Sequence, residues 1–248
     1  MKYRPPRFLF RRAALLRSIR PGESFLEVGA GDLALTGDLL EVFERGFAVE
    51  PNSDLDGFAA SLTSEKQRRL RTADLPLEAI STDERFSCVV CCEVLEHIDD
   101  DRAFSERLLA LVEPGGQVAI SVPARMKWWS THDEIVGHVR RYERDELSDL
   151  LADVGFANVR VLAYGYPWIN LLRYPRLLLA RLQFRERAQW DANTQTANSN
   201  HRQIPEALST SPIRFLIQPW SIAPFAAVSR LFDGSERSDG YLAVATRP

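Results

Sequence analysis

Glycines and carboxylates near the start of the chain have the types and spacing needed to hold a nucleoside-containing ligand. The segment Glu27-Val28-Gly29-Ala30-Gly31-Asp32 places two glycines between an apolar run and a helical pattern. Such a turn lets the backbone approach a ligand closely and points helix N–H groups at it. Glu50 and Asp74 follow the next two apolar runs. Their carboxylates could accept strong hydrogen bonds from ribose hydroxyls or an amino group.

These residues by themselves are compatible with two cofactor chemistries. Gly29, Gly31 and Ala34 also match the dinucleotide fingerprint G-x-G-x-x-A, and Glu50 lies at a suitable distance to hold a ribose. A nicotinamide-dependent oxidoreductase is therefore an alternative that the turn alone leaves open.

A second group of residues could carry acid–base chemistry, and it lies between residues 124 and 142. Two of the four histidines, His132 and His138, fall in this stretch. Histidine is the usual side chain for removing a proton near neutral pH. We take His138 as the first candidate for a general base and His132 as the second. His97 is a third choice, with packing as its alternative role.

Arginines and tryptophans accompany these histidines. Arg140 and Arg141 could bind a phosphate or carboxylate of a substrate, or they could pair with acidic residues of the following helix, Glu143 and Asp145. Trp128 and Trp129 could line a pocket or only pack the loop. No metal site is expected. The pair Cys88 and Cys91 lies in an apolar strand pattern, where residues three apart point to opposite faces.

The elements that must position these residues alternate along the chain. Apolar runs predict strands at 25–30, 47–49, 70–75, 86–94, 117–122, 159–163 and 240–246. Helical spacing predicts four helices between them. The first runs through Leu35, Leu39, Val42 and Phe43, with Gly46 as its C-cap, and the second spans 53–62. The third is capped by residues 99–101 and ended by 114–116, and the fourth runs from Leu147 to Val154. Strands separated by helices predict a Rossmann-like α/β fold with a mostly parallel sheet.

Two segments depart from this rhythm. Residues 166–238 are rich in aromatic residues and prolines and predict an inserted cap, with a polar loop near 191–203. Residues 168–187 resemble a basic amphipathic helix, which could cover a substrate pocket or rest on a membrane. The N-terminal arm 1–20 carries seven basic and no acidic residues, which favours a solvated helix or contact with an anionic surface. Residues 124–142 predict a long loop.

Bulk composition limits the function classes. The 248 residues suit one α/β domain spanning 1–248 with its arm and insertion. A net charge of −3 predicts no general affinity for nucleic acid. No apolar run reaches the length of a membrane span, arginines interrupt any signal-peptide pattern, and the three cysteines fit a reducing compartment, so we expect a cytoplasmic location. The oligomeric state is not readable.

Five motifs in order resemble the class I methyltransferases, close to the ubiquinone-biosynthesis and type 11 or 23 groups. Residues 27–32 resemble the E-x-G-x-G motif, and further similarity lies at Val49-Glu50-Pro51, Asp74-Leu75-Pro76, Cys92-Glu93-Val94-Leu95-Glu96-His97 and Pro114-Gly115-Gly116. The similarity covers about residues 20–165 and the last strand. Gly137-His138-Val139-Arg140-Arg141-Tyr142 resembles a group associated with cell-surface polysaccharide and natural-product pathways.

The resemblance implies a seven-stranded sheet with an antiparallel last strand, S-adenosylmethionine as cofactor, and methyl transfer to a small-molecule, glycan or lipid-linked acceptor, at oxygen. It implies a cofactor site made of Glu27, Gly29, Gly31, Glu50, Pro51, Asp74, Leu75 and Glu93. Leu33 stands where the family often has a third glycine, so we expect its side chain to narrow the turn. A binding module that has lost activity is the remaining alternative.

Overall fold

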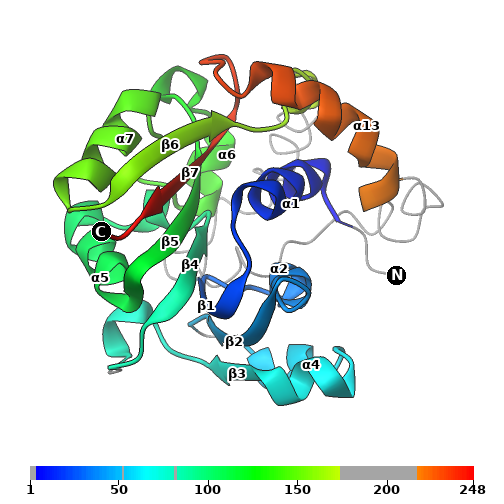
Figure 1. The fold of residues 1–248 in the computed structure, drawn as a ribbon. Helices are drawn as coiled ribbons and strands as arrows, with labels where there is room; N and C mark the ends of the chain where they lie inside the picture. Colours follow the sequence, from blue (N-terminus) through cyan, green and yellow to red (C-terminus); the bar gives the residue numbers. More distant parts are fainter. Residues whose placement is uncertain (1–3, 52, 81–82, 174–216) are drawn as a thin grey trace. The chain divides into compact units, whose positions relative to one another are not determined.

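The computed structural model describes residues 4–51, 53–80, 83–173 and 217–248 (Figure 1). The chain divides into two compact units. The sheet unit comprises Ser18–Val122, Asp145–Val161 and Ala243–Pro248, and the helical unit comprises Met1–Arg17, Pro123–Arg144 and Leu162–Leu242. The organisation of residues 1–248 as a single domain stays a prediction.

Seven strands form one sheet in the order β3-β2-β1-β4-β5-β7-β6 (Figure 1). Their bounds are β1 Gly22–Val28, β2 Phe43–Val49, β3 Leu70–Ala73, β4 Phe86–Cys92, β5 Val112–Pro123, β6 Ala157–Ala163 and β7 Gly240–Thr246. The pairs β1–β2, β1–β4, β2–β3 and β4–β5 are parallel. Strand β7 runs opposite to β6. The predicted Rossmann-like fold with an antiparallel last strand is confirmed.

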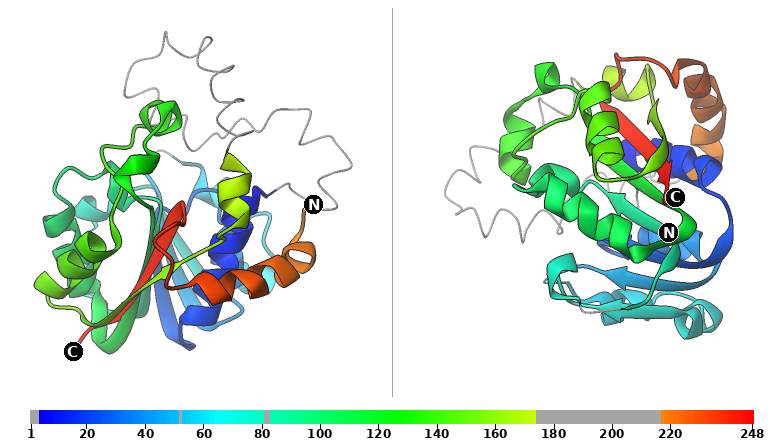
Figure 2. Two further views of the ribbon diagram at one scale, coloured as in Figure 1. Left: turned by 90° about the horizontal axis from the view of Figure 1, so that it is seen from above. Right: turned by 60° about the vertical axis from the view of Figure 1, so that its left-hand side comes forward.

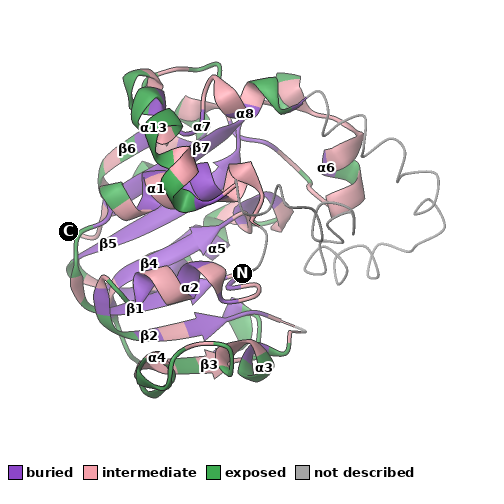
Figure 3. Ribbon diagram, turned by 90° about the vertical axis from the view of Figure 1, so that its right-hand side faces the viewer, coloured by how far each residue is buried: buried purple, intermediate pink, exposed green. Residues whose placement is uncertain are grey.

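Helices on both faces explain why the central strands are apolar along their whole length. Helix α2 (Ala34–Leu39) lies on one face of the sheet and α5 (Asp101–Leu111) on the other (Figure 3). Helix α7 (Arg144–Asp153) lies on the same side as α5 (Figure 2). The three cysteines of β4 are buried, and burial raises the pKa of the Cys88 and Cys91 thiols. Their assignment as small buried side chains is confirmed.

The helix beginning at Asp101 has the cap that the sequence predicts. The Asp100 side chain accepts a hydrogen bond from the Ala103 amide at 2.9 Å, which satisfies one of the unpaired donors of the first turn. Helix α3 (Leu55–Ala59) falls within the predicted range 53–62. A short helix that the pattern did not predict, α4 (Ser64–Arg69), follows α3.

Strand β2 begins earlier than predicted, at Phe43, so Phe43 and Gly46 do not belong to a helix end. Gly46 lies inside β2 and packs under an aromatic ring of the neighbouring strand. A Cβ at Gly46 would lie 2.3 Å from the Phe25 ring. The glycine therefore serves close packing between strands, a role that its sequence context alone does not distinguish from a C-cap.

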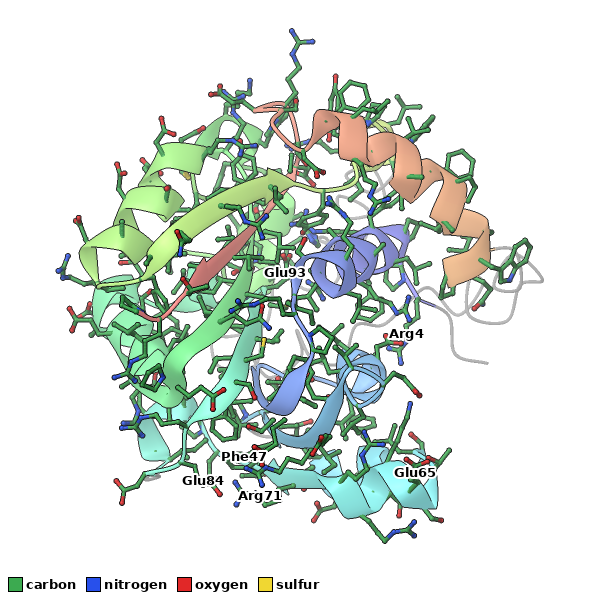
Figure 4. All side chains as sticks on the ribbon, viewed as in Figure 1. Arg4, Phe47, Glu65, Arg71, Glu84 and Glu93 are labelled. Carbon is green, nitrogen blue, oxygen red and sulfur yellow. The ribbon has the colours of Figure 1, made fainter. Side chains whose placement is uncertain are left out.

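Strand β3 is short and lies at the edge of the sheet, next to β2. The Arg71 guanidinium lies over the Phe47 ring, 4.6 Å from its centroid, and pairs with Glu84 (Figure 4).

Strand β5 also begins earlier than predicted, directly after α5. Val112 was expected on the helix and residues 114–116 at its end, but both belong to the strand. The Gly115 amide donates to the Arg247 carbonyl, and the Arg247 amide donates to the Gly116 carbonyl, each at 3.0 Å. The glycines thus join the start of β5 to the residue that follows β7.

The helical unit contains more regular structure than predicted. The expected loop at 124–142 holds η3 (Met126–Trp128) and α6 (Thr131–Val136), so that expectation is wrong. The inserted segment contributes α8 (Trp168–Leu171), α13 (Pro219–Ser229) and η4 (Arg230–Phe232). Most of the predicted helix 168–187 and the predicted loop 191–203 lie outside the described residues.

The N-terminal arm forms a helix, α1 (Pro6–Ser18), as predicted, but it is not simply solvated. Leu9, Phe10 and Leu15 are buried, and Arg7 pairs with Asp239 and Arg17 with Asp233. Part of the basic charge is therefore balanced within the helical unit. In the part of the chain that the structure describes, no helix has the length and apolarity to cross a membrane. Membrane contact through 1–20 or 168–187 stays a prediction.

Candidate active site

The turn after β1 has the geometry that its glycines permit. Gly29 and Gly31 have positive φ angles of 77° and 56°. The Gly29 and Ala30 amides both donate to the Val49 carbonyl, at 3.0 and 3.1 Å, which ties the turn to the end of β2. A Cβ at Gly29 would lie 2.2 Å from the Val94 side chain, whereas a Cβ at Gly31 would meet no atom of the described residues within 4 Å. Gly31 therefore borders open space at the carboxyl edge of the sheet unit.

Leu33 also has a positive φ, 57°, yet its side chain does not narrow the turn as expected. It is 2% exposed and packs in an apolar cluster with Ala30, Ala48 and Leu55. The left-handed backbone, which is strained for leucine, turns the side chain into the core. The missing third glycine is thus accommodated by packing.

Glu50 comes to the glycine turn from the end of β2. It is buried, and its Oε2 accepts a hydrogen bond from the Gly31 amide at 2.9 Å. Pro51 follows and is half-buried. This arrangement places a carboxylate beside the open space at Gly31, where it fits a diol such as the ribose of an adenosine.

Asp74 comes to the same edge from the end of β3. It is exposed, as is Leu75, and its Oδ1 accepts from the Ser53 amide at 3.3 Å. The Ser53 hydroxyl donates to the Gly31 carbonyl at 3.5 Å. Ser53 therefore links the two cofactor motifs. Ser53 was not among the predicted site residues. The one signal for such a role was its position two residues after Pro51.

Glu27 and Glu93 occupy two further strand ends. Glu27 is buried in β1, and its Oε2 accepts from the Thr36 hydroxyl of α2 at 2.5 Å. Glu93 follows β4 with a positive φ of 59°, and its Oε1 accepts from the Ser121 hydroxyl at 3.2 Å (Figure 4). Glu27 thus ties the strand to the helix after the turn. A positive φ at a residue other than glycine, as at Glu93, is common at functional sites.

Four of the predicted cofactor residues, Gly29, Gly31, Glu50 and Asp74, lie together at one edge of the sheet unit, where the glycine turn and Ser53 link them. These residues supply a glycine turn and two carboxylate acceptors beside the open space at Gly31. It suits a ligand with an adenosine and a cationic amino-acid portion. The residues present fit S-adenosylmethionine.

The two candidate histidines between residues 124 and 142 are placed differently. His132 is half-buried in α6. His138 follows α6, and Gly137, with a φ of 77°, turns the chain so that the His138 amide donates to the Asp133 carbonyl at 2.9 Å. The His138 Nδ1 also lies 2.9 Å from the Asp133 Oδ1. His138 is thus held by a carboxylate.

Asp133 was not among the predicted site residues, although it is the central acceptor of this region. It is fully buried, and burial by itself would raise the pKa of its carboxyl. Hydrogen bonds from His138 and Arg141, together with the Arg141 charge, outweigh burial and hold that pKa well below its usual range. The signal in the sequence was Ser130 three residues before Asp133, which is the spacing of a capping box.

Arg141 has neither of the two roles that the sequence suggested. Its side chain is 1% exposed and pairs with Asp133 and Asp239 rather than with Glu143 or Asp145. Glu143 pairs with Arg125. Because Arg141 is enclosed by these partners, it is not placed to bind an anionic group of a substrate.

Trp128 packs against an arginine of the same unit. The Arg173 guanidinium lies 4.6 Å from the Trp128 ring centroid and donates to the Trp128 carbonyl at 2.5 Å. The Trp129 indole donates to Glu134 at 3.3 Å. His97 lies in η2 (Leu95–His97) of the sheet unit and is half-buried. Of the roles considered for Trp128, packing is the one seen.

The fold and the carboxylate-and-glycine edge define a Rossmann-like cofactor-binding protein. Residues 2–161, more than half of the chain, match the family described as methyltransferase domain. The chain belongs to this family. Its cofactor is S-adenosylmethionine, so the nicotinamide alternative is wrong.

Curated relatives are ubiquinone biosynthesis O-methyltransferases. The protein from Rhodopseudomonas palustris (strain TIE-1) is 30% identical over 129 residues, which cover 52% of this chain and 50% of the relative. The protein from Psychrobacter arcticus is 34% identical over 108 residues, 40% of each chain. This chain spans about half the length of the first of these relatives.

Solved structures share the fold at low identity. Phosphoethanolamine N-methyltransferase 2 of Haemonchus contortus, in complex with S-adenosyl-L-methionine, has a TM-score of 0.59 at 14% identity, covering 96% of this chain and 52% of that one. The N-methyltransferase NodS of Bradyrhizobium japonicum, bound to S-adenosylhomocysteine, has a TM-score of 0.51 at 14% identity, covering 98% and 85%.

Proposed function

We propose that this methyltransferase acts on an oxygen atom of a small-molecule, glycan or lipid-linked acceptor, with His138 as general base. S-adenosylmethionine supplies the activated methyl group when bound. The O-methyltransferase names of the curated relatives support an oxygen acceptor. The solved relatives named as N-methyltransferases make an amine the alternative acceptor.

The cofactor residues in this proposal each have a binding or orienting task. Glu50 and Asp74 accept hydrogen bonds from the adenosine portion, and Gly29 and Gly31 leave room for the methionine portion. Glu27 orders the helix after the turn through Thr36. Glu93 presents a carboxylate beyond β4. Pro51 and Leu75 flank the two adenosine acceptors.

The observation that carries the base assignment is the contact between His138 and Asp133. An oxygen acceptor loses a proton as the methyl group arrives, so a positioned base accelerates the step. A carboxylate bound to one imidazole nitrogen orients the ring and leaves the other nitrogen to accept a proton. His138 has this contact at 2.9 Å and is therefore preferred over His132.

The test is a methyl-transfer assay with labelled S-adenosylmethionine and a panel of a catechol, a hexose, a polyprenyl-linked phenol and a primary amine. We expect product from at least one hydroxyl acceptor. His138→Gln should lower kcat by about 10²–10⁴-fold, the usual contribution of a general base. His132→Gln, the matched control, should change it little. Methylation of the amine alone, or full turnover by His138→Gln, would show that the proposal is wrong.

A further inference from the structure

The Asp133 carboxylate of α6 accepts hydrogen bonds from three side chains and one backbone amide. Its Oδ2 accepts from the Ser130 amide at 2.8 Å, the Ser130 hydroxyl at 2.9 Å and the Arg141 Nη2 at 3.1 Å. Its Oδ1 accepts from the Arg141 Nε at 2.8 Å and contacts the His138 Nδ1 at 2.9 Å. The lone pairs of both oxygens are thus directed at donors.

This environment decides the protonation of the His138 ring. An ionised carboxylate can only accept hydrogen bonds, so the His138 Nδ1 must carry the proton that it shares with Asp133. The low pKa of Asp133 agrees with an ionised group. In a neutral imidazole with its proton on Nδ1, the lone pair lies on Nε2.

Arg141 fixes the carboxylate in turn. Its Nη1 donates to the Asp239 Oδ1 at 2.9 Å and to the Ala124 carbonyl at 3.0 Å. Asp239 is itself fully buried and also accepts from Arg7 at 2.8 Å and from Arg173 at 3.2 Å. The orientation of Asp133 is therefore set by segments from four parts of the helical unit.

We propose that Asp133 is the positioning residue of the acceptor chemistry: it holds the His138 ring in the Nδ1–H tautomer, so that Nε2 is the basic nitrogen. Arg141 and Asp239 hold Asp133 in place, and the contacts described for them are with carboxylate and carbonyl groups rather than with the His138 ring. The inference rests on the proposed role of His138 as general base, although the tautomer is measurable without any acceptor.

The variant Asp133→Asn should reverse the tautomer. An asparagine presents an amide N–H₂ group on one of its two sides. On the Oδ2 side it would face the Ser130 amide and the Arg141 Nη2, which can only donate. On the Oδ1 side it faces only one group that must donate, the Arg141 Nε, and it also faces His138, which can accept at Nδ1 if its proton moves to Nε2. The amide group is therefore accommodated best where the imidazole changes its tautomer, and Nε2 then ceases to be basic.

The experiment is a ¹⁵N nuclear magnetic resonance measurement of the histidine side chains in the whole protein. The pH of the sample is set about two units above the ordinary imidazole pKa of about 6.5. The His138 signals are assigned by their loss in His138→Gln. We expect the proton on Nδ1 in the unaltered protein and on Nε2 in Asp133→Asn. With an acceptor from the panel, kcat of Asp133→Asn should fall by about 10²-fold or more with little change in KM.

The matched control is Asp239→Asn, which removes the same charge from the same ion network. The contact with the His138 Nδ1 belongs to Asp133, so in Asp239→Asn the His138 ring should keep its proton on Nδ1 even if the melting temperature falls. A reversed tautomer in Asp239→Asn would overturn the assignment to Asp133, as would an unchanged tautomer in Asp133→Asn. If Asp133→Asn does not fold, the unaltered protein decides, because a proton on Nε2 there overturns the proposal.

The two proposals fail separately. If His138 has the expected tautomer and its loss leaves turnover unchanged, the base assignment is wrong while Asp133 still fixes the ring. If His138→Gln is inactive but the tautomer is not the expected one, His138 acts without positioning by Asp133.

Discussion

Glu50 has a structural contact in the glycine turn and a proposed contact with the ligand. Its Oε2 fixes the glycine turn through the Gly31 amide, which lies at the open edge of the sheet unit. A charged acceptor is needed because a carboxylate binds hydroxyl and amide donors about twice as strongly as a neutral group does.

We predict that Glu50→Gln weakens binding of S-adenosylhomocysteine by roughly 10- to 100-fold, since a hydrogen bond to a charged group contributes about 1.5–3 kcal/mol. Isothermal titration calorimetry measures this. Glu44→Gln, on the exposed side of the same strand, is the control and should bind normally. Equal affinity of all three proteins would exclude Glu50 from the cofactor site.

Leu33 gives a second prediction at the residue scale. Leu33→Gly removes a left-handed backbone strain of about 1–2 kcal/mol but also removes a buried side chain, whose truncation costs about 2–5 kcal/mol. We expect a net loss of about 1–3 kcal/mol in the free energy of unfolding, measured in urea, with unchanged affinity for S-adenosylhomocysteine. Tighter binding by Leu33→Gly would mean that the side chain narrows the turn after all.

At the scale of the element, α6 is short, and a residue of its N-terminal cap also binds side chains outside the helix. Ser130 and Asp133 form the capping box, and the same carboxylate holds the Arg141 side chain and the His138 ring. Six residues of helix would contribute little stability alone, so tertiary partners must maintain it.

The stability of this element should depend on pH. Because the Asp133 pKa is lower in the folded protein than the unfolded value of about 3.9, its contribution is complete above that value and is lost as pH falls toward the folded pKa. We expect the urea midpoints of the unaltered protein and Asp133→Asn to differ most near pH 7 and to converge below about pH 4. A gap that widens in acid would contradict this sign.

At the scale of the whole molecule, cofactor binding should stabilise the fold by mass action. Ligand at 100 times its Kd adds about 2.7 kcal/mol, and for a chain of this size that corresponds to a rise in melting temperature of roughly 5–10 °C. We predict this shift with S-adenosylhomocysteine, by differential scanning calorimetry, for the unaltered protein and His138→Gln alike. Glu50→Gln should show a smaller shift. NADH should produce none.

Most of the sheet unit could be predicted from the sequence because its signals are local. Apolar runs, the glycine turn and the carboxylates after β2 and β3 are each short motifs, and the parallel sheet brings strand ends to one edge. Errors arose where one residue type has two uses. Gly46 resembles a helix cap but lies under Phe25, and Val112 continues a helical spacing but begins a strand.

The sequence alone determined the fold class, the strand ends that carry the predicted cofactor residues, and the presence of histidines suited to acid–base chemistry. Only the tertiary structure decided what surrounds them. Arg141 and Asp239 are 98 residues apart, and no local pattern predicts that they share a buried ion pair. Burial removes the water that would otherwise satisfy these charges, so each must find a partner wherever the fold supplies one. That requirement selected Asp133, rather than a substrate anion, as the partner of Arg141.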